Sequence, residues 1–116
     1  MYKIKTFNKI SNKGLVRFPG HYEVGPDLAA ADAILVRSHK LQDSDATPGL
    51  RAVARAGAGV NNVPVVPYTE QGIVVFNTPG ANANAVKELV LCGMLLSSRG
   101  ILPGMAYVST LRDMSD

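Results

Sequence analysis

The sequence predicts an α/β domain, in which helices flank a parallel β-sheet. Two observations indicate this class. Three compact apolar runs, of the kind found in strands buried on both faces, end in polar or glycine residues: 33–36 (AILV), 50–57 (LRAVARAG) and 73–76 (IVVF). Between the last two, segment 64–72 opens with a proline and closes with a glycine, as short helices do. A strand, a helix and a strand in this order form a βαβ unit.

The amino-terminal residues predict two more strands and a helix. Residues 2–7 (YKIKTF) alternate in polarity as a strand does, and a second brief strand is expected at 21–24 (HYEV). A helix is expected between them, within 10–18. With 116 residues, of which 47% are hydrophobic and 18% charged, the chain is long enough for one domain with a proper core.

The longest predicted helix runs from an asparagine cap to Gly100. Asn82 or Asn84 can accept the free backbone amides at its start. From 89 to 96 the helix is apolar on nearly every face, and such a helix must be covered on all sides. A domain of this size has few elements for that. We therefore expect the 82–98 helix to pack against a partner domain or a second copy of the chain, as in a homo-oligomer.

Composition and charge disfavour several classes of partner. The net charge of +3 comes from scattered Lys and Arg, without the clusters that a nucleic-acid surface needs. The apolar run 89–96 is far shorter than the roughly 20 residues of a membrane span. Cys92 is the single cysteine, and residues 1–7 lack the apolar stretch of a signal peptide, so we expect a cytoplasmic protein with no internal disulfide. No metal site is expected.

Polar residues follow the three apolar strands. Because parallel strands point the same way, the loops that leave their carboxyl ends gather along one edge, where ligands of such sheets bind. The loops carry 37–40 (RSHK), Arg55 with 57–62 (GAGVNN), and 77–82 (NTPGAN). Guanidinium groups bind carboxylate or phosphate, and glycine lets backbone N–H groups approach an oxyanion. These loops therefore predict a site for a small anionic molecule.

The glycine loop differs from a dinucleotide-binding turn. That fingerprint needs a third glycine where this chain has Asn62, and an acidic residue about 20 positions on, where only Glu88 stands, inside the long helix. We interpret the loop as a turn for an anion or substrate. Plainer explanations remain open: a tight turn for the glycines, solvated surface positions for Arg37 and Arg55, and a helix cap for Asn82.

Three segments, in this order and spacing, resemble the amino-terminal half of D-2-hydroxyacid dehydrogenases: LVRSHKL, ARAGAGVNNV and GIVVFNTPGANANAVKELVLCGMLLSSRGI. The resemblance is strongest to members that oxidise 3-phosphoglycerate to 3-phosphohydroxypyruvate, in serine biosynthesis. It implies a flavodoxin-like substrate-binding domain over 1–100 that ends in the inter-domain helix. Residues 101–116 would then begin the linker into a separate Rossmann domain that holds NAD.

The resemblance also implies roles for six residues. Arg37 and Ser38 match the arginine–serine pair on the substrate side, and Arg55 matches an arginine suited to the substrate phosphate. Ala58 and Gly59 match the loop whose backbone amides meet the substrate carboxylate, with Ala58 beside the nicotinamide. Asn82 matches an asparagine that lines the same cleft.

The family's catalytic arginine, glutamate and histidine would lie beyond position 116, so the chain is expected to be inactive alone. Two other functions remain open. One is another 2-hydroxyacid dehydrogenase, such as a hydroxypyruvate or glyoxylate reductase. The other is a non-catalytic flavodoxin-like module that binds anions. A phosphoacceptor receiver is disfavoured, because it needs aspartates at strand ends where this chain has Arg37, Gly57 and Asn77.

Overall fold

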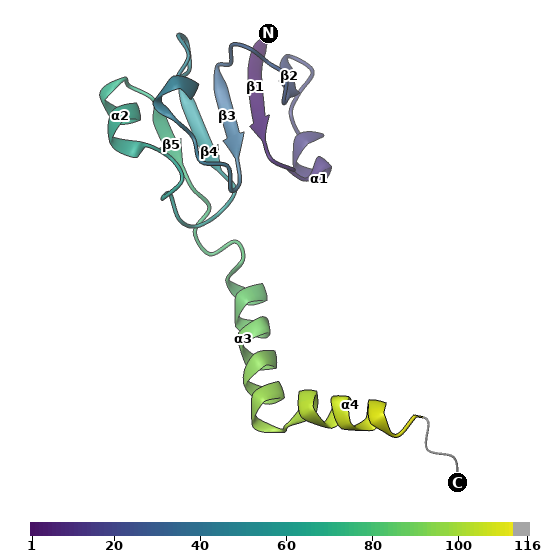
Figure 1. The fold of residues 1–116 in the computed structure, drawn as a ribbon. Helices are drawn as coiled ribbons and strands as arrows, with labels where there is room; N and C mark the ends of the chain where they lie inside the picture. The colour runs from purple at the N-terminus through teal and green to yellow at the C-terminus, as the bar shows by residue number, and fades with distance from the viewer. Residues whose placement is uncertain (113–116) are drawn as a thin grey trace. The chain divides into compact units, whose positions relative to one another are not determined.

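The computed structural model describes residues 1–112, which form two compact units, Met1–Ala81 and a second that begins at Asn82. The elements of the first unit are β1 (Tyr2–Phe7), α1 (Asn12–Leu15), β2 (Tyr22–Gly25), β3 (Ala33–Val36), the 3-10 turn η1 (Asp43–Asp45), β4 (Ala52–Arg55), α2 (Val65–Glu70) and β5 (Val74–Phe76) (Figure 1). The second unit contains α3 (Ala83–Ser98) and α4 (Ile101–Thr110).

The strands form one parallel sheet in the order β2-β1-β3-β4-β5. This is the doubly wound order of flavodoxin-like domains, so the predicted fold class is confirmed. The three apolar runs are neighbouring strands, with Ile34 beside Val53 and Val53 beside Val75. Since every strand runs in one direction, the loops after β1, β3, β4 and β5 leave from the same edge of the sheet (Figure 1).

The main hydrophobic cluster lies on one face of this sheet. Buried side chains from β3, β4, α2 and the connecting segments pack together there: Ile34, Val36, Leu41, Leu50, Val53, Val63, Tyr68 and Ile73. Tyr68 is fully buried, and its hydroxyl donates a hydrogen bond of 2.8 Å to the backbone oxygen of Gln42. Burial raises the pKa of Tyr68 to about 12, and the nearby carboxylates of Asp45 and Asp43 contribute to the same shift.

The predicted elements of the first unit are found, some of them with shifted ends. β3 has the predicted bounds, and β2 begins one residue later than predicted. The helix expected within 10–18 is only four residues long and buries no side chain, so no packing extends it. α2 follows Pro64, and Gly72 stands just past its end with a φ of 74°, the left-handed conformation that glycine adopts at helix ends.

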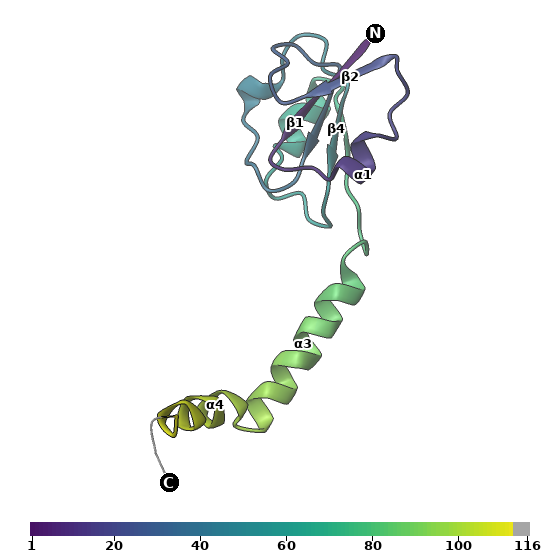
Figure 2. The ribbon, with the colours of Figure 1, turned by 90° about the vertical axis from the view of Figure 1, so that its right-hand side faces the viewer.

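The second unit contains one helix that the sequence pattern did not predict. α3 confirms the helix expected over 82–98, whereas α4 forms where 101–116 was expected to begin a linker. Pro103 does not prevent this, because it is the third residue of α4. The backbone N–H groups of the first helical turn have no acceptor within the helix, so a proline there removes no hydrogen bond. Gly100, with a φ of 59°, makes the bend between the helices (Figure 2). Residues 113–116 of that segment lie outside the described residues.

The apolar residues of the second unit have no cover within it. No described residue of α3 or α4 is buried, and Leu89 is 73% exposed. Cys92 is exposed as well. In residues 1–112 no single helix is long and apolar enough to cross a bilayer, although α3 and α4, bent by 58°, meet that test as a pair.

Candidate functional site

The carboxyl-edge loops, 8–11, 37–42, 56–64 and 77–81, are the loops that follow β1, β3, β4 and β5. They hold four of the six predicted site residues, and a fifth, Arg55, lies at the end of β4 beside them. Arg37 and Ser38 directly follow β3, Arg55 ends β4, and Ala58 and Gly59 come three and four residues later. Hydrogen bonds between neighbouring loops bring these residues to one edge of the sheet.

Arg55 connects the loops after β3 and β4. Its Nε donates a hydrogen bond of 3.0 Å to the backbone oxygen of Arg37. Its guanidinium lies so close to Gly57 that a Cβ at position 57 would collide with it. Gly57 is therefore needed for the space that this arginine occupies. The terminal nitrogens of Arg55 make no hydrogen bond within residues 1–112.

The glycine loop is also fixed from the side of β5. Asn77 Nδ2 donates to the backbone oxygen of Ala58 at 2.7 Å, and the backbone N–H of Thr78 donates to Gly57 O at 2.9 Å. Ala58 and Gly59 are exposed, and neither backbone N–H donates a hydrogen bond within the described part of the chain. Two amides are thus free to bind an oxyanion on a loop held on both sides.

Asn62, which stands at the third position of the dinucleotide fingerprint, has a structural role. Its side chain is buried, and Nδ2 donates to the backbone oxygens of His39 at 2.8 Å and Arg37 at 3.4 Å. The backbone oxygen of Asn62 accepts from Leu41 N at 2.9 Å. Its Oδ1 is buried without a hydrogen-bond partner among the described residues. Asn62 therefore joins the loops after β3 and β4.

The sequence pattern did not include the loop after β1 in the site. Asn8 lies there with a φ of 64°, and its Oδ1 accepts from the backbone N–H groups of Ser38 at 3.0 Å and His39 at 2.6 Å. The His39 ring stacks on Phe7, with centroids 4.6 Å apart. An asparagine directly after a strand was an available signal, because asparagine is enriched in the left-handed conformation.

Asn82 is the one predicted site residue that lies outside the first unit. It is the N-cap residue of α3, but its side chain makes no capping hydrogen bond. Asn84 does not cap the helix either: it is the second residue of α3, its Oδ1 accepts no hydrogen bond within residues 1–112, and its Nδ2 donates to Glu88 Oε1 at 2.8 Å. The expectation that one of these side chains caps the helix was therefore wrong. A substrate role for Asn82 stays a prediction.

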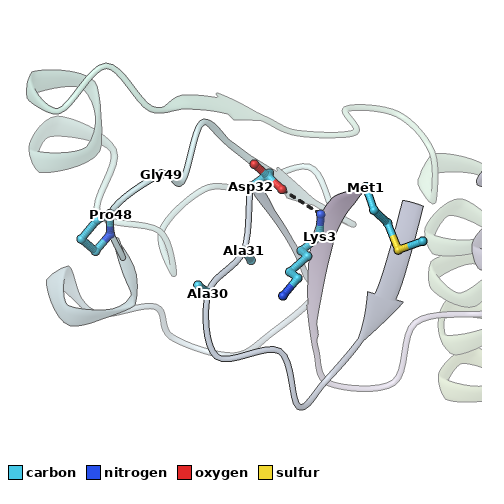
Figure 3. Close-up of a pocket in the computed structure, with 7 residues that line it drawn as sticks. All are labelled: Met1, Lys3, Ala30, Ala31, Asp32, Pro48 and Gly49. Atoms are coloured by element: carbon cyan, nitrogen blue, oxygen red, sulfur yellow. Dashed lines mark hydrogen bonds between the residues drawn. The ribbon is translucent and has the colours of Figure 1, made fainter. Parts of the chain in front are cut away.

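A hollow of about 220 Å³ lies at the opposite, amino-terminal edge of β1 and β3 (Figure 3). Asp32 borders it, but this carboxylate is already engaged, since Oδ2 accepts from the backbone N–H of Lys3 at 2.8 Å. The backbone N–H of Asp32 donates in turn to Lys3 O at 2.8 Å. Because this pair fixes the start of two strands, we do not assign the hollow to function.

A family model described as D-isomer specific 2-hydroxyacid dehydrogenase, catalytic domain, matches residues 7–114. D-3-phosphoglycerate dehydrogenase of Mycobacterium tuberculosis strain H37Rv is 44% identical over 87 residues, which are 66% of this chain and 16% of that protein. Hydroxypyruvate reductase of Thermotoga maritima is 42% identical over 73 residues, 60% of this chain and 24% of that protein. The chain thus spans a minor part of these relatives.

Two solved structures have a similar fold. NAD+-bound 3-phosphoglycerate dehydrogenase of Entamoeba histolytica aligns with a TM-score of 0.66 at 26% identity, over 82% of this chain and 38% of that one. A protein of Pyrococcus horikoshii aligns with a TM-score of 0.67 at 16% identity, over 97% of this chain and 39% of that one. The second likeness concerns the fold alone.

Proposed function

Because the chain belongs to the D-isomer specific 2-hydroxyacid dehydrogenases, we propose that its sheet domain binds the substrate of an NAD-dependent dehydrogenase. The proposed substrate is 3-phosphoglycerate, whose 2-hydroxyl is oxidised to give 3-phosphohydroxypyruvate. The 44% identity to the M. tuberculosis phosphoglycerate dehydrogenase supports this choice. It is a small molecule with a carboxylate at one end and a phosphate at the other, and the carboxyl-edge loops offer donors for both.

The observation that carries the proposal is the pair of free backbone amides on Ala58 and Gly59. Both are exposed, and their loop is tied to its neighbours by Asn77 and Thr78. Backbone N–H groups that are fixed before the ligand arrives bind an oxyanion without further ordering. They are therefore the proposed donors to the substrate carboxylate. The family resemblance supports the further proposal that Ala58 lies beside the nicotinamide.

The proposed phosphate contacts are arginines. Arg55 is anchored through Nε and keeps its terminal nitrogens available, and Arg37 is exposed on the neighbouring loop. A guanidinium fork matches phosphate oxygens with two parallel hydrogen bonds. Ser38 adds a hydroxyl on the loop after β3. For Asn82 we propose the substrate role that the family resemblance implies.

The role proposed for these residues is orientation. Held at both ends, the substrate presents the carbon that bears the 2-hydroxyl, and such positioning supplies a large part of many rate enhancements. NAD, bound mainly by a domain outside these 116 residues, supplies the hydride acceptor. We assign no general base within residues 1–112. The purified chain mixed with NAD and 3-phosphoglycerate should produce no NADH, and NADH formation above a protein-free control would overturn this division of roles.

Calorimetric titration of the chain with 3-phosphoglycerate and with D-glycerate tests the proposed ligand. Arg55→Ala should weaken 3-phosphoglycerate binding by about 10- to 100-fold, the value of one or two charge-assisted hydrogen bonds, and leave D-glycerate binding nearly unchanged. Arg51→Ala is the matched control, because exposed Arg51 precedes β4 at the opposite edge of the sheet. Equal losses for both ligands would remove Arg55 from the phosphate role.

A second candidate is a hydroxypyruvate reductase, favoured by the 42% identity to the T. maritima enzyme. Such an enzyme would use the amides of Ala58 and Gly59 in the same way, with no phosphate to hold. It predicts that D-glycerate and 3-phosphoglycerate bind equally well to the wild-type chain. Tighter binding of the phosphorylated ligand would favour the phosphoglycerate enzyme.

We propose further that α3 packs against a partner domain or a second copy of the chain. The support is its apolar surface, which no residue of its own unit buries. Sedimentation over a range of concentrations tests this, with Leu91→Glu as the variant. If a second copy of the chain covers α3, the wild-type chain should associate and Leu91→Glu should stay monomeric. Monomeric wild type that binds no apolar dye would contradict both forms of the proposal.

A further inference from the structure

A cavity of about 500 Å³ lies at the carboxyl edge and is lined by Lys9, Ile10, Ser11, Asn12 and Arg37. Of these residues, only Arg37 has an assigned role. The first four belong to the segment after β1, and Arg37 directly follows β3. The cavity is larger than the 220 Å³ hollow at the opposite edge. Two segments of the chain that are far apart in sequence, one after β1 and one after β3, thus form the walls of the cavity.

The strand order explains why a cavity forms at this place. β1 and β3 are neighbours in the sheet, but the chain passes from β1 to β2 on one side and from β3 to β4 on the other. The two loops therefore diverge and leave a crevice between them. In open α/β sheets, ligands bind at this topological switch point.

The walls of the cavity are positively charged. Lys9 and Arg37 contribute two cations, Ser11 and Asn12 contribute a hydroxyl and an amide, and no carboxylate lines it. Within residues 1–112, neither the Lys9 ammonium nor the Arg37 guanidinium makes a hydrogen bond or an ion pair. Two unpaired cations across a crevice attract an anion more strongly than either does alone.

The two walls are held together by Asn8. Its side-chain oxygen accepts from the backbone N–H groups of Ser38 and His39, the residues that follow Arg37, while Lys9 is the next residue along the chain. The hydrogen bonds thus join the segments that carry the two cations. A ligand finds these segments already fixed, which lowers the entropic cost of binding.

We propose that this cavity binds a phosphate group, with Lys9 and Arg37 as its counter-charges. Lys9 is then a specificity-determining residue that favours phosphorylated over unphosphorylated 2-hydroxy acids. The identity of the full ligand rests on the function proposed above. The affinity of the cavity for phosphate itself does not, so the two can be tested separately.

Titration of the chain with inorganic phosphate, followed by amide NMR shifts, tests the cavity directly. Lys9→Gln should weaken phosphate binding at least 10-fold, whereas Lys9→Arg, which keeps the charge, should stay within about 3-fold of wild type. Lys13→Gln is the matched control, because Lys13 is an exposed cation on α1 that does not line the cavity. Lys9 is exposed, and far-ultraviolet circular dichroism checks that each variant is folded.

The outcomes separate the two proposals. Equal phosphate affinities for Lys9→Gln and Lys13→Gln would overturn the cavity assignment, as would wild type that binds no phosphate. Phosphate binding that depends on Lys9, in a chain that does not bind 3-phosphoglycerate, would support the cavity and contradict the proposed substrate. A Lys9→Gln chain that no longer binds 3-phosphoglycerate but still binds D-glycerate would support both proposals.

Discussion

The two units of the chain differ in how their apolar side chains are used. In residues 1–81 the apolar runs form neighbouring strands, and their side chains make a core with α2. In α3 and α4 an equally apolar sequence buries nothing within its own unit. Apolar sequence alone therefore specifies a helix or a strand, whereas a core also needs a second surface. The first unit contains that surface, and we propose that the second finds it outside.

The largest expected effect comes from a matched pair of truncations, one in each unit. Ile34→Ala should lower the free energy of unfolding by about 2–5 kcal/mol, because Ile34 is 2% exposed and its removal leaves a cavity. Leu91→Ala should cost less than about 0.5 kcal/mol at low concentration, because Leu91 is 52% exposed. Urea unfolding measures both. Equal losses would mean that α3 has a core of its own.

The next largest effect is expected from removing hydrogen bonds that join the loops of the first unit. Asn62→Ala removes two hydrogen bonds to the backbone oxygens of Arg37 and His39, and should cost about 2 kcal/mol. It should also weaken anion binding, because it frees the loop that carries Arg37. Asn84→Ala in α3 is the control, since its amide bonds only to Glu88 on the exposed surface. A stable Asn62→Ala chain with unchanged binding would refute this role.

Tyr68 gives a smaller effect with a distinct pH dependence. Tyr68→Phe removes the donor to the backbone oxygen of Gln42 and should cost about 1 kcal/mol at pH 7. In the folded chain the pKa of Tyr68 is raised from 10.0 to about 12, so the unfolded chain releases this proton first. Wild-type stability is therefore intact below pH 10 and falls as the pH rises toward 12. Tyr68→Phe should lose less stability over the same interval, and parallel curves would contradict this.

The smallest effect on stability is expected at the glycine loop. Gly57→Ala puts a Cβ where the Arg55 guanidinium lies, and this flexible group can move away at a cost below about 1 kcal/mol. Binding of 3-phosphoglycerate should nevertheless fall as much as in Arg55→Ala. Gly14→Ala, which has open space around its new methyl group, should leave binding unchanged. Full affinity in Gly57→Ala would show that the position of Arg55 does not matter.

The parallel sheet and most of its edge loops could be predicted from the sequence. The runs around Ile34, Val53 and Val75 are apolar on both sides, which is the pattern of central strands. Because parallel strands share a carboxyl edge, the residues that follow these runs, among them Arg37 and Gly59, were expected to lie together. Resemblance to a family supplied the individual roles.

The remaining features depend on contacts that no local pattern contains. The bonds from Asn8 to Ser38 and from Asn62 to His39 join residues more than twenty positions apart, so their partners could not be read from the sequence. α4 was missed because Pro103 and Gly104 suggest a break, although the first turn of a helix tolerates proline. The cavity beside Lys9 required the strand order, which shows that β1 and β3 are neighbours.

The central claim is that the carboxyl-edge loops act as one binding site for a small acid. Titration of isotope-labelled chain with 3-phosphoglycerate, followed residue by residue through backbone amide shifts, tests it most directly. The amides of Ser38, Ala58 and Gly59 should move together along one saturating curve, while Lys3 and Asp32 at the opposite edge stay still. Shifts confined to the opposite edge, or different curves for the two loops, would contradict the claim.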